Sequence, residues 1–267
     1  MRKKTRLIGA AMVGAVLLPL GASTAFAGPE SAGAPAEATR DCSAPLPDDP
    51  TAAAKQFLTL VGTLDDRGLT QAEIDAKLAA DNCLDRVDSG GGVDTRDPDD
   101  EITLSRPEIY KVSGKNRYVA RAAWKWTKIP KEVKGYDGFG LSFSKKVAPV
   151  SHVLRYRGKF MDWKTKTQAK ASNSYGSGFI FNEGPRGGTG DLADMQGRIG
   201  EMGITFKAAK KGCSRHQVFS AYGHTWNSTD VTGMTIGADS FGFAWSSSSN
   251  RWDQASRASS EVKVCRS

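Results

Sequence analysis

The feature that most constrains the fold is a series of short alternating runs that fills residues 102–267. In these runs aromatic and β-branched residues alternate with polar ones, and Gly, Asn, Asp and Ser separate one run from the next. The pattern predicts about eleven strands, among them residues 117–127, 150–157 and 216–226, and no long helix. We therefore expect a predominantly antiparallel all-β domain of the sandwich or jelly-roll-like type, with a barrel as the alternative.

Residues 41–88 have a different pattern, which indicates helices. Apolar residues recur at helical spacing between residues 57 and 64. Thr70 and Glu73 then form the capping box that typically starts a second helix. The chain is thus predicted to be α+β: a small acidic helical hairpin, a Gly- and Asp-rich linker at residues 89–101, and the basic all-β domain.

The first 27 residues have the three parts of a secretion signal. A cationic head at residues 1–6 precedes an apolar stretch at residues 7–22, and Ala25 and Ala27 offer small side chains to a signal peptidase. This apolar stretch of about 16 residues is shorter than the roughly 20 that a membrane-spanning helix needs. We expect cleavage after Ala27, a disordered spacer at residues 28–40, and a secreted, extracellular protein without a stable membrane anchor.

Four cysteines follow the predicted signal peptide. An even number of cysteines in an exported chain indicates disulfide bonds, and the sequence has no C-x-x-C motif that would point to a metal site. Three pairings are possible for four cysteines. Their clustering along the sequence favours Cys42 with Cys83 and Cys213 with Cys265.

Charge is distributed unevenly along the mature sequence. Residues 28–101 contain 6 basic and 17 acidic residues, whereas residues 102–267 contain 27 and 12. Several cations of the second part lie opposite the apolar side of their predicted strands. We expect them to form a basic surface that faces solvent and binds an acidic polymer: Arg121, Lys125, Arg155, Arg157, Lys164, Lys166 and Lys170. The alternative is an ordinary solubilising face, and the acidic segment can also fold back and mask it.

Tryptophan residues are a second candidate feature for ligand binding. Tyr118, Trp124 and Trp126 share one face of a predicted strand, so we expect them in the core. Trp163 and Trp252 instead stand beside aspartates in turn-like sequence, and we expect them to be exposed. Because an exposed indole offers a flat apolar face, both are candidates for stacking on a glycan.

Signatures of catalysis are few. The sequence has neither a G-x-S-x-G nor an H-E-x-x-H motif. A structural role is expected for the histidines, and His224 is the first to test for catalysis. Asp191 and Asp194 lie in a Gly-rich loop and, with Glu183 or Glu201, are candidates for the paired carboxylates of a glycoside hydrolase. A mobile surface loop is the favoured interpretation of that segment.

We expect no metal site and no cofactor. His216 and His224 are predicted to lie on one strand, where a rise of about 3.3 Å per residue separates them by roughly 26 Å. The acidic residues of the linker at residues 89–101 are typical calcium ligands, but that run lacks the glycine that an EF-hand loop needs. A solvated acidic linker is therefore the better interpretation.

Together these observations favour a secreted, non-catalytic protein that binds an extracellular or cell-envelope polyanion or glycan. One alternative is a secreted toxin or pore-forming β protein, in which residues 164–177 refold into a membrane hairpin. Another is an extracellular hydrolase that acts on glycans. We expect no dedicated nucleic-acid partner, and the sequence leaves the oligomeric state open.

Overall fold

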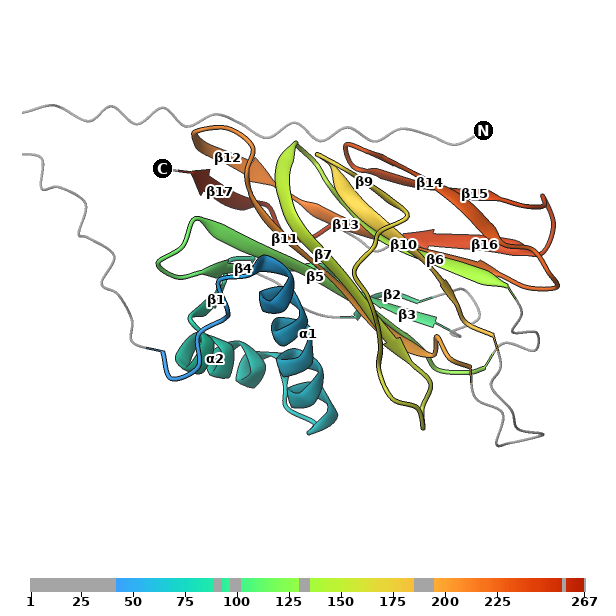
Figure 1. Cartoon of the computed structure of the whole chain (residues 1–267), viewed down its shortest axis with the longest axis horizontal. Helices are drawn as coiled ribbons and strands as arrows, with labels where there is room; N and C mark the ends of the chain where they lie inside the picture. Colours follow the sequence, from blue (N-terminus) through green and yellow to red (C-terminus); the bar gives the residue numbers. More distant parts are fainter. Residues whose placement is uncertain are drawn as a thin grey trace, which may run out of the picture. The chain divides into compact units, whose positions relative to one another are not determined.

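The computed structural model describes residues 42–88, 93–96, 102–129, 135–184, 195–255 and 258–266, with only the backbone at 93–96 and 254. In these residues the chain is mostly antiparallel β-sheet with two helices, which confirms the β-rich architecture predicted from the sequence (Figure 1). The predicted signal peptide and spacer, most of the linker, and the loop with Asp191 and Asp194 lie outside the described residues.

Both helices begin at a residue that caps their free backbone N–H groups. Helix α1 (Pro50–Asp66) begins after Asp49, whose carboxylate accepts a 2.7 Å hydrogen bond from the backbone of the first turn. Helix α2 (Gln71–Asn82) begins at the capping box that the sequence predicts, formed by Thr70 and Glu73. Neither helix of the described residues has the length and apolar character needed to cross a membrane.

Eight strands of the described residues form one sheet, which we call sheet A. Its main path runs in the order β1 (Leu84–Arg86), β4 (Glu108–Val112), β5 (Arg117–Trp126), β11 (Ile199–Ala208), β7 (Val147–Arg157) and β8 (Lys164–Lys166). Two further strands lie off this path: β2 (Val93–Arg96) pairs with β3 (Ile102–Ser105), which pairs with β5. The pairing of β5 and β7 through β11 brings together segments that are far apart in the sequence.

A second, five-stranded sheet, sheet B, runs in the order β16 (Arg251–Ala255), β13 (Val218–Thr225), β6 (Tyr136–Phe143), β10 (Gly176–Asn182) and β9 (Ala171–Asn173). Two strand pairs complete the described fold: β12 (Gly212–His216) with β17 (Val262–Arg266), and β14 (Val231–Gly237) with β15 (Ser240–Trp245). The strand predicted over residues 216–226 is present as β13, but His216 does not belong to it, because β12 ends at His216 in a different sheet.

The main hydrophobic core lies between the two sheets, and a second core lies between the helices and sheet A. Alternation along β5 divides its side chains between these cores: Trp124 and Trp126 are buried in the first, as predicted, and Val119 is buried in the second. The helices therefore cover the outer face of sheet A, where Phe57 and Leu58 of α1 are fully buried.

The β14–β15 hairpin covers part of the outer face of sheet B (Figure 1). The ring of Phe241 lies directly over Gly140 of β6, and a Cβ atom at residue 140 would overlap that ring. Glycine is therefore required at residue 140 by the close approach of the hairpin.

Both predicted disulfides are present, Cys42–Cys83 and Cys213–Cys265, and no cysteine is free. The first ties the segment before α1 to the end of α2. The second joins β12 to β17, at a position where the two cysteines are direct partners across the strand pair. Disulfides are typical of an oxidising compartment, so they are consistent with an extracellular protein.

Candidate functional site

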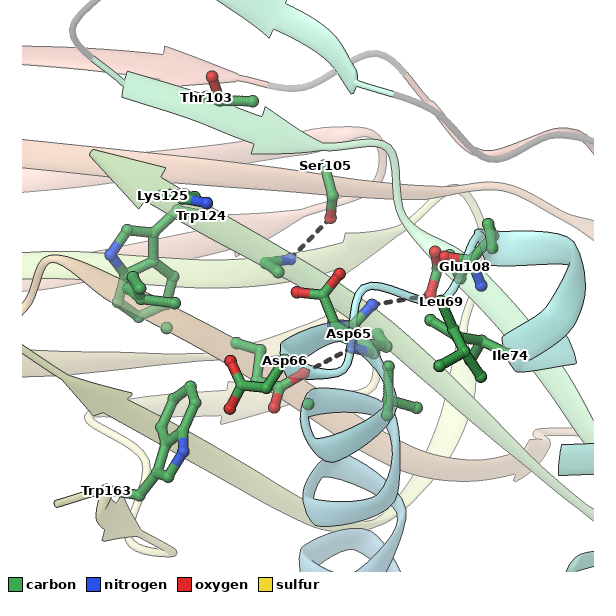
Figure 2. Close-up of a pocket in the computed structure, with 18 residues that line it drawn as sticks. Asp65, Asp66, Leu69, Ile74, Thr103, Ser105, Glu108, Trp124, Lys125 and Trp163 are labelled. Carbon is green, nitrogen blue, oxygen red and sulfur yellow. Dashed lines mark hydrogen bonds and ion pairs between the residues drawn. The ribbon is translucent and has the colours of Figure 1, made fainter. Parts of the chain in front are cut away.

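A pocket of about 400 Å³ lies between the two helices and the outer face of sheet A (Figure 2). The end of α1 and the start of α2 form one side, strands β3, β5 and β11 form the floor, and Trp163 of the β7–β8 loop stands on another side. This volume falls in the range of about 300–1,000 Å³ that is common for small-molecule sites. The pocket thus has the size to hold one small ligand or one unit of a polymer.

Buried ion pairs lie at the base of the pocket. Arg121 donates to Glu108 at 2.9 Å and to Glu201 at 2.6 Å, and Arg155 donates to the other oxygen of Glu201. Each of these four side chains is buried. Burial raises the pKa of Glu108, although Arg121 opposes that shift. Since a buried charge is stable only when paired, the network holds β4, β5, β11 and β7 in one arrangement.

Trp163 is fixed in place by two arginines. The guanidinium carbon of Arg155 lies 4.0 Å from the ring centroid, and that of Arg157 lies 4.7 Å from it. Arg157 also donates to both carboxylate oxygens of Asp66 at the end of α1, at 2.8 and 2.9 Å. The orientation of the indole is therefore coupled to the ion pairs of sheet A and to the position of α1.

Several polar groups of the pocket have no partner among the described residues. The carboxylate of Asp65, the hydroxyl of Thr103 and the ammonium of Lys125 make no hydrogen bond or ion pair with another described side chain or backbone group. Ser105 accepts a 2.8 Å hydrogen bond from the backbone of Ala123 and keeps its own hydroxyl proton to donate. These groups offer both donors and acceptors to a ligand.

The prediction that the basic surface faces solvent is wrong for Arg121 and Arg155, which are 7% and 5% exposed. The physical reason is that β11 lies between β5 and β7 and brings Glu201 to both arginines, while α1 covers this part of sheet A. Helix α1, which is one part of the acidic segment, covers Arg121 and Arg155, and its Asp66 pairs with Arg157.

The remaining predicted cations do not form one exposed surface. Lys164 donates to Gln196, and Lys166 donates to the backbone oxygen of Ile180 at 2.7 Å; both side chains are half-buried. Burial lowers the pKa of Lys166. Only Lys125 and Lys170 of the predicted set are exposed in the described residues. Whether any of the seven binds a ligand stays a prediction.

Trp252 and His224 lie away from the pocket, against the core. Trp252 is half-buried, and its ring centroid lies 5.6 Å from that of His224 and 5.9 Å from that of Trp126. Trp163 is half-buried as well, so neither tryptophan is fully exposed as expected, but Trp163 lines the pocket. His224 is buried beside Asp137 and Glu183.

Sequence reasoning missed most of the acidic and hydroxyl groups of the pocket. Asp65 and Asp66 end a helix, and Thr103 and Ser105 lie on a short strand, so none of them belongs to a recognisable motif. The alternation of Thr103 and Ser105 with buried Ile102 and Leu104 is the one signal that places them on an outer face.

No protein-family model matches the chain, and no curated protein matches it. The solved structures that are similar in part include the following three. NetB toxin of Clostridium perfringens in its membrane-inserted form is 8% identical over 64% of this chain and 94% of that chain, with a TM-score of 0.31. AvmM, which catalyses macrocyclization in alchivemycin A biosynthesis, is 11% identical over 66% and 97%, with a TM-score of 0.28. Clostridium perfringens delta-toxin is 6% identical over 69% and 90%, with a TM-score of 0.21.

Proposed function

We propose that this protein is exported and works outside the cell as a non-catalytic binding protein for an extracellular glycan. In this proposal the leader is removed after Ala27, the chain folds as a helical hairpin on a jelly-roll-like sandwich, and one sugar unit of the glycan occupies the pocket. The two disulfides support export, because such bonds persist in oxidising compartments.

The observation that carries the proposal is the position of Trp163 on the pocket. Arg155 and Arg157 hold its indole ring, so the ring loses little freedom when a ligand stacks on it. Asp65, Thr103 and Lys125 lie around the same space without partners among the described residues, and they match the alternating donors and acceptors of sugar hydroxyls. An aromatic platform with a few polar groups is the usual composition of a small-ligand site.

The pocket supports binding better than hydrolysis. Both oxygens of Glu201 accept charge-assisted hydrogen bonds from arginines, and Glu108 is also paired with Arg121. A general acid must reach the glycosidic oxygen, and carboxylates that are buried and held by arginines in this way do not. Asp65 and Asp66 also disfavour a polyanion in this particular pocket, because they place negative charge on its side.

The test is binding of the mature chain to insoluble polysaccharides such as chitin, cellulose and peptidoglycan, followed by tryptophan fluorescence with soluble fragments of the one retained. We expect Trp163→Ala to weaken binding about tenfold, which is the effect of losing one aromatic stack. Phe160→Ala is the matched control, because Phe160 lies in the same loop and is 77% exposed. Equal retention of wild type and Trp163→Ala would contradict the proposal.

A second candidate function, polyanion binding, is favoured by a different surface, which we call the basic end. The β12–β17 pair, the β11–β12 turn and the β6–β7 turn meet there and carry seven exposed cations: Lys145, Lys146, Lys210, Lys211, Arg215, Lys263 and Arg266. Burial lowers the pKa of His216 in β12, and the nearby Lys145 ammonium lowers it further. In the described residues Glu261 pairs with Arg215 and leaves the other six without an ion pair.

Heparin chromatography of the mature chain tests this second candidate. Clustered cations release counterions when they bind a polyanion, so elution should move to lower salt when Lys145, Lys146, Lys210 and Lys211 are replaced by Ser. The control replaces the exposed Lys55, Lys77, Lys128 and Lys170 by Ser, with the same change in net charge. If both variants elute together, the basic end has no special role.

A further inference from the structure

Three side chains that can bind a metal converge at one end of sheet B. Asp137 is the second residue of β6, Glu183 follows β10, and His224 lies near the end of β13. The strand register places these positions next to each other, since Phe181 pairs with Asp137 and Gly223 pairs with Gly138. One oxygen or nitrogen atom from each of the three lies within 4.8 Å of the other two.

All three side chains point into the protein. Asp137 and Glu183 are 0% exposed, and His224 is 3% exposed. They continue the inward alternation of Phe139, Phe181 and Tyr222 on their strands. A buried, ionised carboxylate destabilises the fold unless a nearby positive charge or hydrogen-bond donors compensate it.

Asp137 has its partners, but Glu183 does not. Tyr222 donates to Asp137 Oδ2 at 2.5 Å, and the backbone N–H of Thr225 donates to Oδ1 at 2.9 Å. Neither oxygen of Glu183 has a hydrogen-bond partner in the described residues, although Oε1 lies 3.2 Å from Nδ1 of His224. The same Nδ1 lies 3.1 Å from Asp137 Oδ2. One ring nitrogen carries at most one proton, which does not satisfy two carboxylates.

We propose that Asp137, Glu183 and His224 bind one zinc ion through two carboxylate oxygens and the imidazole Nδ1. A cation between these atoms compensates the orphaned carboxylate of Glu183 and uses the ring nitrogen as a ligand. The ligand set of one nitrogen and two oxygens suits zinc, whereas calcium prefers six to eight oxygens. None of these three residues lines the pocket beside Trp163, so this proposal does not depend on the proposed function.

The surroundings of the three residues fit such a site. Tyr222 and Thr225 orient Asp137 through their hydrogen bonds, as the residues behind a metal ligand commonly do. The ring of Trp126 lies 4.8 Å from that of His224, in an edge arrangement, and restricts its rotation. Because the ligands come from β6, β10 and β13, the ion would join three strands, and its fourth coordination position would stay open.

In the metal-free chain two of the three groups hold a proton more tightly than usual. Burial raises the pKa of Glu183 well above its ordinary value, and Asp137 adds to that shift. For His224 burial lowers the pKa, but Asp137 and Glu183 outweigh burial and raise it to about 10. Because both shifts favour the protonated form, a proton and a zinc ion compete for these two groups.

The experiment uses the full mature chain, treated with EDTA, dialysed and titrated with ZnCl₂ in a calorimeter. We expect one zinc per chain and a rise in the thermal midpoint. Cobalt(II) should give visible absorption bands of a low-coordinate site, which Glu183→Gln, a variant of the same shape, should abolish.

Glu183→Gln and His224→Gln should each weaken zinc binding by roughly 100-fold, because each removes one of three ligands. The control is His152→Gln with His216→Gln, since these are the histidines outside the cluster. Zinc binding that the cluster variants leave unchanged, or that the control abolishes, would overturn the proposal. So would an unchanged thermal midpoint with no heat of binding, which would mean that the three residues share protons alone.

Discussion

Arg157 donates hydrogen bonds to both carboxylate oxygens of Asp66, at 2.8 and 2.9 Å, and these bonds connect the last turn of α1 to strand β7 of sheet A. The same guanidinium lies 4.7 Å from the ring centroid of Trp163. One arginine thus links a helix end, a strand and the aromatic wall of the pocket. A substitution that breaks this link should therefore change the pocket while changing the stability of the fold only slightly.

Replacing Asp66 by Asn should separate the effect on stability from the effect on the pocket. The carboxylate of Asp66 is about half exposed, so losing the ion pair should lower the free energy of unfolding by only about 0.5 kcal/mol. Trp163 should nevertheless become more mobile, which steady-state anisotropy and acrylamide quenching measure. Unchanged quenching would show that Arg155 alone fixes the indole.

Gly62 of α1 offers a test in which two effects oppose each other. Alanine favours a helix by about 1 kcal/mol over glycine. A Cβ atom at residue 62, however, would overlap the guanidinium of Arg155, which Glu201 and Trp163 hold in place. We expect the overlap to win, so that Gly62→Ala lowers the free energy of unfolding by about 1–2 kcal/mol in urea titrations. The control for helix propensity is Ala52→Gly, which makes the reverse change in the same helix. Gly68→Ala does not serve as this control, because Gly68 has a positive φ of 77° that strains any residue other than glycine.

Glu201→Gln should be the most destabilising polar substitution of the outer face of sheet A. It leaves Arg121 and Arg155 buried without their shared negative partner, at a cost of about 3–5 kcal/mol. Glu261→Gln is the matched control, because its ion pair with Arg215 is exposed and should contribute almost nothing. Chemical denaturation of both variants measures their loss of stability. Equal midpoints would mean that water solvates the two arginines once Glu201 has lost its charge.

The buried network also marks the limit of what the sequence predicts. Local patterns were sufficient for the capping box at Thr70 and for the inward face of β5 with Trp124, because both depend on neighbours within a few residues. The exposure of Arg121 and Arg155 was predicted wrongly because it depends on β11, whose Glu201 is 80 residues from Arg121 in the sequence. No periodicity specifies which strand lies between two others.

The cluster of Asp137, Glu183 and His224 was missed for the same reason. Sequence reasoning considered Glu183 and His224 separately, and it gave Asp137 no role. Their three strands are neighbours only in the folded sheet. A usable signal was the placement of Asp137 on the same strand face as Phe139, since a carboxylate on an apolar face implies a buried partner.

Gly140→Val should test how firmly the β14–β15 hairpin is packed on sheet B. The valine side chain would collide with the ring of Phe241, so we expect the free energy of unfolding to fall by about 1–3 kcal/mol. Removing that ring in the double variant Gly140→Val with Phe241→Ala should recover part of the loss, which makes the two effects non-additive. Strictly additive effects on the free energy of unfolding would show that the hairpin moves away from the sheet without loss of stability.

The pH dependence of stability in EDTA tests the protonation of the cluster. The folded pKa of His224 is raised from 6.5 to about 10, so its contribution is complete below pH 6.5 and is lost as the pH rises towards 10. The raised pKa of Glu183 acts in the same direction, because folding holds a proton that the unfolded chain releases. Asp137 has a lowered pKa despite its burial, so its contribution is lost only in acid, outside this window. We therefore expect the free energy of unfolding of the metal-free chain to fall by at least about 1 kcal/mol between pH 6.5 and 9.

The matched comparison for this pH series is the double variant Glu183→Gln with His224→Gln, which keeps similar shapes and removes both titrating groups. Its free energy of unfolding should change less over the same interval, because neither amide exchanges a proton. Zinc should reverse the trend in the wild-type chain, since its ligands must lose their protons before they bind and higher pH favours that loss. Urea titrations at pH 6.5 and 9, with EDTA or with ZnCl₂, measure all of these effects. Parallel curves for the wild type and the double variant would show that the cluster does not titrate as its burial and charges require.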